Sequence, residues 1–218
     1  MVTSQRSLLL QERIPDTCPT KIHTQAPHPN ESFARFQASA ISRPDCGVAG
    51  SAPAPAVATA AAGTTISFKW TEWPDSHVGP VVTYLAKAPS DITKWNPGTS
   101  AVWFKVAEQG LVNGKWAATD ILKANNWVYS FKLPASLAPG QYIVRHELIA
   151  LHAAYSYPGV QIYPSCLQIT VTGSGTSTGP SNKVSFPGAY TASTPGIVYD
   201  AYKGLTTYPI PGPAVWTG

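Results

Sequence analysis

The chain has 218 residues, which suits one all-β domain, or one domain with an additional terminal segment. Charged residues make up only 12% and hydrophobic residues 44%, and the 21 prolines and 17 glycines favour a turn-rich secreted β protein over a cytosolic helical one. The net charge of +4 is mild, and the chain has no Lys/Arg-rich run that would indicate a nucleic-acid partner. It also has no apolar run near the roughly 20 residues that a membrane helix needs.

Residues 1–44 differ in sequence pattern from the rest of the chain. They show no sustained hydrophobic periodicity, and the apolar run at 8–10 is too short for the core of a signal peptide. We expect this atypical segment to be poorly ordered and separate from a domain over residues 45–218. The Ala/Pro-rich stretch at 52–62 is predicted to be an extended connection.

Short alternating segments separated by turn signals predict the strands that follow. The turns are indicated by Asn-Pro-Gly at 96–98, Asn-Gly at 113–114 and Ala-Pro-Gly at 138–140. We expect strands at 64–70, 79–86, 101–106, 127–133, 141–152 and 159–171. With no strong helix, this pattern predicts an all-β, immunoglobulin-like antiparallel β-sandwich with long loops. The Pro-, Gly- and Tyr-rich residues after 183 should wrap over the surface without adding core strands.

The two longest predicted strands carry the most informative polar residues. Both faces of 141–152 are largely apolar, which indicates a central strand covered on both sides. His152, Gln161 and Tyr163 fall at neighbouring strand ends, where converging polar groups predict a site. The alternative is that they are hydrogen-bonded core groups, and the residues alone leave both interpretations open.

The three cysteines, Cys18, Cys46 and Cys166, leave at least one unpaired, and no CxxC or Cys/His cluster suggests zinc. One disulfide would indicate an oxidising compartment. Three reduced, buried thiols are the alternative.

Four segments, in this order, resemble the fungal lytic polysaccharide monooxygenases of auxiliary-activity family nine, once classed as a glycoside hydrolase family. They are SHVGPV (76–81), PGQYIVRHELIALH (139–152), GVQIYPSC (159–166) and YPIPGPAVW (208–216). The resemblance runs from about Cys46 to Gly218. It implies a secreted β-sandwich with one copper ion on a flat face. Such a protein oxidises glycosidic bonds of cellulose at C1, C4 or both, using an external electron donor and O2 or H2O2.

The family motifs imply specific roles for residues of this chain. Copper is held there by a histidine brace, which consists of the amino group and side chain of an N-terminal histidine plus a second histidine. The second histidine matches His77, and the axial tyrosine matches Tyr163. His152 and Gln161 match the outer pair that positions the oxygen species. Imidazole and amine nitrogens suit Cu(II).

Other matches are implied in the same way. Arg145 and Glu147 match a family pair, expected here as a charge pair that orients Gln161 and His152. The family disulfide matches Cys46 and Cys166.

The implied partner is a cellulose or related β-glucan surface bound by a monomer, with no nucleic acid and no membrane. Tyr208, and after it Tyr202, are the candidates for stacking on sugar rings, because tyrosine is rigid and amphipathic. For each, the alternative is a tyrosine that pins the long C-terminal loop.

The chain departs from the family at its start. It begins Met1-Val2-Thr3 and has no histidine before His23, so as written it cannot supply the first histidine of the brace. We expect that residues 1–44 stand, through a misassigned first exon, in place of a signal peptide and a strand beginning with histidine. Otherwise the chain is a divergent paralogue that kept the scaffold and lost the activity.

Two other functions compete with the monooxygenase. A non-catalytic polysaccharide-binding β-sandwich would use the same aromatic face without the copper brace. A hydrolase would need two carboxyl groups about 5–9.5 Å apart across a cleft. Acidic residues are few here, and the one in the strong motif, Glu147, is close to Arg145.

Overall fold

The computed structural model describes residues 33–34 and 53–218, and its larger sheet has five strands in the order β2-β10-β9-β4-β5. These strands are β2 (Ala58–Ala61), β4 (Val81–Lys87), β5 (Trp103–Gln109), β9 (Gly140–Ala150) and β10 (Gln161–Thr172). Neighbours pair antiparallel except β2, which runs parallel to β10. β9 is therefore the middle strand, as predicted, and β10, the longest strand, lies beside it.

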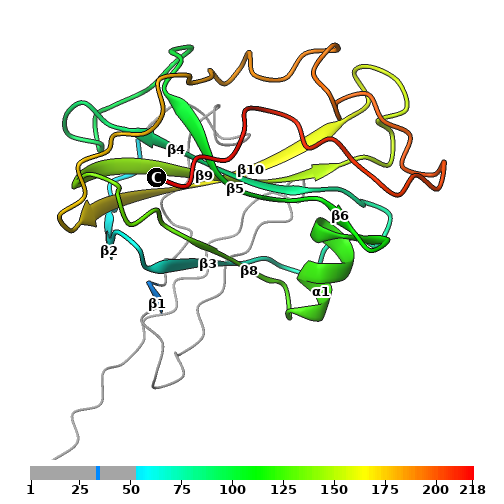
Figure 1. Cartoon of the computed structure of the whole chain (residues 1–218), viewed down its shortest axis with the longest axis horizontal. Helices are drawn as coiled ribbons and strands as arrows, with labels where there is room; N and C mark the ends of the chain where they lie inside the picture. The colour runs from blue at the N-terminus through cyan, green and yellow to red at the C-terminus, as the bar shows by residue number, and fades with distance from the viewer. Residues whose placement is uncertain (1–32, 35–52) are drawn as a thin grey trace, which may run out of the picture.

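A smaller sheet packs against one face of the five-stranded sheet (Figure 1). It has the order β1-β3-β8, with β1 (Phe33–Ala34), β3 (Thr65–Lys69) and β8 (Val128–Lys132). A hairpin of β6 (Leu111–Val112) and β7 (Lys115–Trp116) precedes a π-helical turn (Ala117–Ile121) and α1 (Leu122–Ala124). Asn113 and Gly114 both have positive φ, as the Asn-Gly hairpin signal predicts. The predicted antiparallel β-sandwich with long loops is confirmed.

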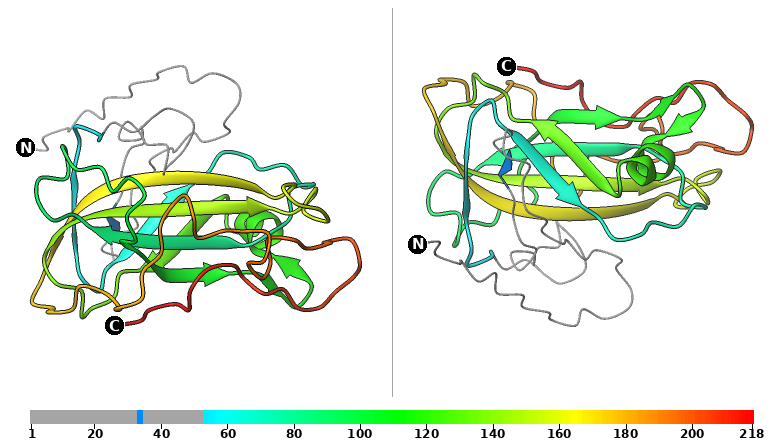
Figure 2. Two further views of the ribbon diagram at one scale, coloured as in Figure 1. Left: turned by 90° about the horizontal axis from the view of Figure 1, so that it is seen from above. Right: turned by 90° about the horizontal axis from the view of Figure 1, so that it is seen from below.

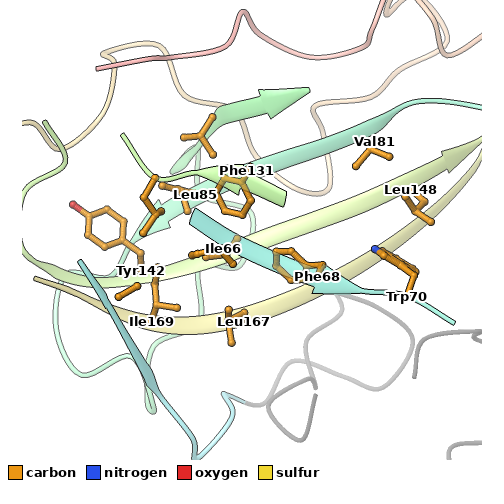
Figure 3. Close-up of a cluster of buried hydrophobic side chains, with 14 of the residues drawn as sticks. Ile66, Phe68, Trp70, Val81, Leu85, Phe131, Tyr142, Leu148, Leu167 and Ile169 are labelled. Atoms are coloured by element: carbon orange, nitrogen blue, oxygen red, sulfur yellow. The ribbon is translucent and has the colours of Figure 1, made fainter. Parts of the chain in front are cut away.

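The main hydrophobic core lies between the two sheets (Figure 3). Phe68 of β3 and Phe131 of β8 face Val144 and Leu148 of β9 across this layer. Successive side chains of a strand point to opposite faces, so Ile143 lies in a second cluster on the other side of the larger sheet. The prediction that this strand is apolar on both faces and covered on both sides is confirmed.

Residues 173–218 cover the outer face of the larger sheet and add no strand of three or more residues. Figures 1 and 2 show this segment, coloured orange to red, on the side opposite β3 and β8. An isolated bridge joins Val184 to Trp103, and the backbone N–H of Trp216 donates to the carbonyl of Lys105 at 2.8 Å. Phe186 enters the second core cluster. The predicted surface wrapping is confirmed, although the segment also buries apolar side chains.

Three local predictions need correction. The Ala/Pro-rich stretch contains β2, which pairs with residues 169–172 of β10 and closes one edge of the sheet. A helical segment also follows β7, where we expected none. The strand predicted at 141–152 is β9, which ends at Ala150. His152 therefore lies in the β9–β10 loop.

Cys166 is disulfide-bonded and buried, which excludes three free thiols. Cys18, Cys46 and the predicted boundary at residues 44/45 lie outside the described residues, so the pairing with Cys46 remains a prediction. Within the described part of the chain, no helix is long and apolar enough to span a membrane.

Candidate functional site

The predicted polar residues meet at one end of the sandwich, where the β3–β4 loop, the β9–β10 loop and the start of β10 lie together (Figures 1 and 2). The rings of His77 and His152 are 4.0 Å apart between centroids, and those of His77 and Tyr163 are 6.2 Å apart. The Tyr163 hydroxyl donates to Oε1 of Gln161 at 2.5 Å. We call His77, His152, Gln161 and Tyr163 the loop-end cluster.

The main chain sets the position of the β3–β4 loop. The N–H of Ile149 donates to the carbonyl of Pro80 at 3.1 Å, and the N–H of Leu151 donates to that of Val78 at 2.8 Å. Gly79 lies between these bonds, and a Cβ there would be 1.8 Å from the carbonyl oxygen of Ile149. Glycine is therefore required for the loop to approach the end of β9 so closely.

Hydrogen bonding and electrostatics favour a neutral, metal-binding form of His77. Its Nδ1 lies 3.0 Å from the Ser76 hydroxyl. In the tautomer in which Nδ1–H donates to that oxygen, the Nε2 lone pair is available to a metal. Burial, and after it the charge of His152, lower the pKa of His77. A histidine must be neutral to ligate a metal, so these effects would keep His77 able to act as a ligand at lower pH.

Trp73 contacts two members of the loop-end cluster, and our sequence analysis missed it. Its side chain is 1% exposed, and Nε1–H donates to the carbonyl of His77 at 2.9 Å. Its ring meets the Tyr163 ring edge-on at 4.9 Å and the His77 ring at 5.6 Å. The signal was available in the sequence, because this tryptophan lies four residues before His77 in a loop that otherwise reads as polar.

The loop-end cluster fits part of a copper site. Two imidazoles and a phenol supply the nitrogen and oxygen donors that suit Cu(II). Nδ1 of His152 is buried and has no hydrogen-bond partner among the described residues, so this polar ring has bonding capacity left over. Across residues 53–218, however, no group of three or more His, Cys, Asp or Glu side chains could hold a metal ion. The described residues thus supply part of a donor set, centred on His77.

Arg145 and Glu147 form the predicted charge pair, at 2.8 Å and with both side chains buried. The expected contact with Gln161 and His152 is wrong. Both members of the pair point to the outer face of β9, where the Tyr190 hydroxyl donates to Glu147 and the Arg145 guanidinium lies 4.2 Å from the ring centroid of Phe186. We call Arg145, Glu147 and Tyr190 the C-terminal anchor, because they join β9 to the C-terminal segment.

The two candidate sugar-stacking tyrosines differ in environment. The Tyr208 ring packs edge-on against Trp116 and Tyr199, at 5.1 Å and 4.9 Å, and its hydroxyl donates to the carbonyl of Gly196 at 2.9 Å. Burial raises the pKa of that hydroxyl, so it remains a donor. These contacts favour the alternative in which Tyr208 holds the long C-terminal loop in place. Tyr202, in contrast, is 67% exposed.

Two further exposed tyrosines lie in the loop that carries His152. Tyr155 and Tyr157, in the β9–β10 loop, are 64% and 55% exposed. That loop carries His152 and reaches the same end of the molecule as the turn with Tyr202 (Figure 1). The sequence signal that we did not use is AAYSYPG, a loop with two tyrosines between the two motif-bearing strands.

Comparison with known proteins gives the family. The family model described as Auxiliary Activity family 9 (formerly GH61) matches residues 3–208. The chain is 64% identical over 174 residues to AA9 family lytic polysaccharide monooxygenase B of Gloeophyllum trabeum, covering 78% of this chain and 69% of that protein. It is 58% identical over 176 residues to monooxygenase A of the same fungus, covering 78% and 55%.

Solved structures agree. Cel61B of Hypocrea jecorina, a glycoside hydrolase family 61 member, superimposes with a TM-score of 0.71 at 39% identity, covering 80% of this chain and 77% of that one. A cellulose-active polysaccharide monooxygenase from M. thermophila gives 0.65 at 38% identity, covering 78% of each. The fold is thus that of a β-sandwich polysaccharide monooxygenase. This chain belongs to Auxiliary Activity family 9.

Proposed function

We propose that this chain is a copper-dependent lytic polysaccharide monooxygenase that cleaves β-1,4-glycosidic bonds of cellulose, at C1, C4 or both. The observation that carries the proposal is the loop-end cluster, in which His77, His152 and Tyr163 meet beside an exposed face. We further propose that it acts outside the cell as a monomer. Membership of the family and 38–39% identity to the two solved monooxygenase-family structures support this function.

In this proposal His77 would hold the copper ion through Nε2, and the Tyr163 hydroxyl would supply a further oxygen donor. Bound copper would supply one-electron chemistry toward O2 or H2O2, with electrons from an external donor. Oε1 of Gln161 accepts a hydrogen bond from the Tyr163 hydroxyl, which orients the glutamine amide. The His152 imidazole lies against His77, where it could hold or release a proton.

The exposed tyrosines supply the proposed polysaccharide contacts. Tyr202, Tyr155 and Tyr157 each present more than half of their surface to solvent, and the N–H of Tyr199 donates to the carbonyl of Ala154 at 2.8 Å, which joins the two segments that carry them. Aromatic rings placed in this way bury the apolar faces of sugars while their hydroxyls stay solvated. We therefore move the leading stacking role from Tyr208 to Tyr202.

A non-catalytic polysaccharide-binding module is the second candidate. The observation that favours it is that the described residues hold no group of three or more metal-binding His, Cys, Asp or Glu side chains, whereas the exposed tyrosines need no metal. Such a protein would bind cellulose and release no products.

Product analysis separates these functions. The protein secreted by its natural source is first sequenced from its N-terminus, then incubated with cellulose, copper and a reductant. Oxidised chain ends that require copper and reductant, and that disappear in His77→Ala, are expected. Binding without products would support the binding module, and unoxidised sugars alone would indicate a hydrolase. Asp75→Ala is the matched control, because it lies two residues before His77 and removes only an exposed ion pair with Lys123, so it should retain most of the activity.

A further inference from the structure

Three polar atoms in the inter-sheet core have no hydrogen-bond partner among the described residues. They are Nε1 of Trp70, Nε2 of His146 and Oγ of Ser165. The three residues are 2%, 0% and 1% exposed. Buried polar atoms without partners are rare in native proteins, and an internal water is a common explanation.

The three residues are neighbours across three strands. His146 of β9 is directly opposite Ser165 of β10 in the strand register, and cross-strand partners lie on the same face of the sheet. That face is the inner one, because Phe68 stacks on the His146 ring at 4.3 Å. Trp70, just beyond β3, covers the same ring at 5.7 Å between centroids. Figure 3 shows the indole nitrogen of Trp70 on the Phe68 side of its ring.

The chemistry of the three atoms selects the ligand. An indole N–H only donates, a serine hydroxyl both donates and accepts, and a neutral imidazole has one nitrogen of each kind. Nδ1 of His146 already bonds the Thr83 hydroxyl at 2.9 Å, and burial lowers the pKa of His146 to about 3, so the ring is neutral. A cation would be repelled by the indole N–H, and an anion would find no positive group. A small neutral molecule that both donates and accepts satisfies all three atoms.

We infer that a water molecule is held inside the core between Trp70, His146 and Ser165. It accepts a hydrogen bond from the Trp70 indole N–H and forms hydrogen bonds with His146 Nε2 and Ser165 Oγ. This water joins the end of β3 to β9 and β10. It also lies one layer of side chains beneath the loop-end cluster, because Ser165 is two residues from Tyr163 on one face of β10, and Trp70 meets Trp73 edge-on at 6.0 Å. The inference is independent of the proposed copper chemistry.

The test detects the water at the indole proton. In 15N-labelled protein, the Trp70 indole signal is identified by its loss in Trp70→Phe, and its cross-relaxation with long-lived water is measured. A cross-peak is expected for Trp70 and not for Trp73, whose equally buried indole N–H already donates to the His77 carbonyl. A crystal structure should show the water within about 3.2 Å of at least two of the three atoms.

Ser165→Ala tests the third contact without filling the space. Losing one hydrogen bond should speed exchange of the Trp70 indole proton with solvent roughly fivefold. Ser67→Ala is the matched control, because Ser67 on β3 bonds Ser130 at 2.7 Å and belongs to the other face of that strand. Equal exchange in both variants, an empty space in the crystal, or a direct Trp70–Ser165 hydrogen bond would overturn the inference.

Discussion

The loop-end cluster and the C-terminal anchor both use residues on or just after β9, yet they satisfy their polar groups in opposite ways. In the anchor, Glu147 is fully buried and receives hydrogen bonds from both Arg145 and Tyr190. In the loop-end cluster, His152 keeps a buried nitrogen without a partner among the described residues. The difference shows that the polar groups of the anchor are saturated by protein partners, as suits a structural role, whereas the loop-end cluster keeps a nitrogen that a ligand could use.

The largest expected effect tests the structural side of this comparison. Glu147→Ala should lower the free energy of unfolding by about 3–5 kcal/mol, because it leaves a buried guanidinium unpaired. Denaturant unfolding measures the change. The control is Asp75→Ala, which removes an exposed ion pair with Lys123 and should cost less than about 1 kcal/mol. Similar losses of unfolding free energy in the two variants would show that the buried anchor contributes no more to stability than the surface ion pair.

The pH dependence of stability tests the buried His146, which belongs to neither the loop-end cluster nor the C-terminal anchor. Its folded-state pKa, about 3, lies below the ordinary value of 6.5. Between these values the unfolded chain binds a proton that the folded chain does not, so stability should fall as the pH is lowered, by up to about 1.4 kcal/mol per pH unit. His146→Gln should flatten this part of the profile, measured by denaturant unfolding from about pH 4 to 7. An unchanged slope would mean that His146 is not the responsible group.

Trp73→Phe tests whether Trp73 supports copper binding at the loop-end cluster. It removes the donor to the His77 carbonyl but keeps an aromatic ring beside Tyr163. We expect the Cu(II) affinity to fall about tenfold, as when outer partners of a ligand are lost, with a shifted Cu(II) electron paramagnetic resonance spectrum. Trp216→Phe is the same substitution at a ring that contacts Phe104 instead, and should leave both unchanged. A loss of stability alone in Trp73→Phe would show that Trp73 only fills the core.

The smallest effects distinguish the two tyrosines of the C-terminal segment. Tyr202→Ala should weaken cellulose binding by about 1 kcal/mol with no change in stability, because an exposed ring is lost. Tyr208→Phe should instead lower stability by about 1 kcal/mol and leave binding intact, because only the bond to Gly196 is lost. Binding isotherms and thermal unfolding of both variants check the pair. The reverse pattern would restore Tyr208 as the stacking residue.

The sequence predicted those parts of the fold whose pattern is local. The two apolar faces of β9 indicated the central strand, and the Asn-Gly signal located the turn between β6 and β7. β2 was missed as a strand because alanines carry little β signal, and this short strand depends on its partner β10 for its hydrogen bonds. The helical turn at 117–124 is too short for a hydrophobic period to be detected.

The candidate site was predictable in its members and less so in its contacts. Motif matching named His77, His152, Gln161 and Tyr163, which the structure brings together. The neighbours Arg145 and Glu147 pointed away from them, because side chains alternate along a strand and the odd positions of β9 face the C-terminal segment. Which distant residue meets them, such as Tyr190, depends on how a long loop folds back, and no local pattern encodes that.

The glycine at position 79 has a consequence for which substitutions this site can tolerate. Because the main-chain N–H groups of Ile149 and Leu151 bond the carbonyls that flank Gly79, the separation of the main-chain segments that carry His77 and His152 is set by backbone hydrogen bonds. Side chains around the two histidines can therefore be exchanged to adjust reactivity or surface preference while this main-chain separation is retained. A change at Gly79 itself would shift the whole loop, so tolerance to substitution should fall abruptly at this position.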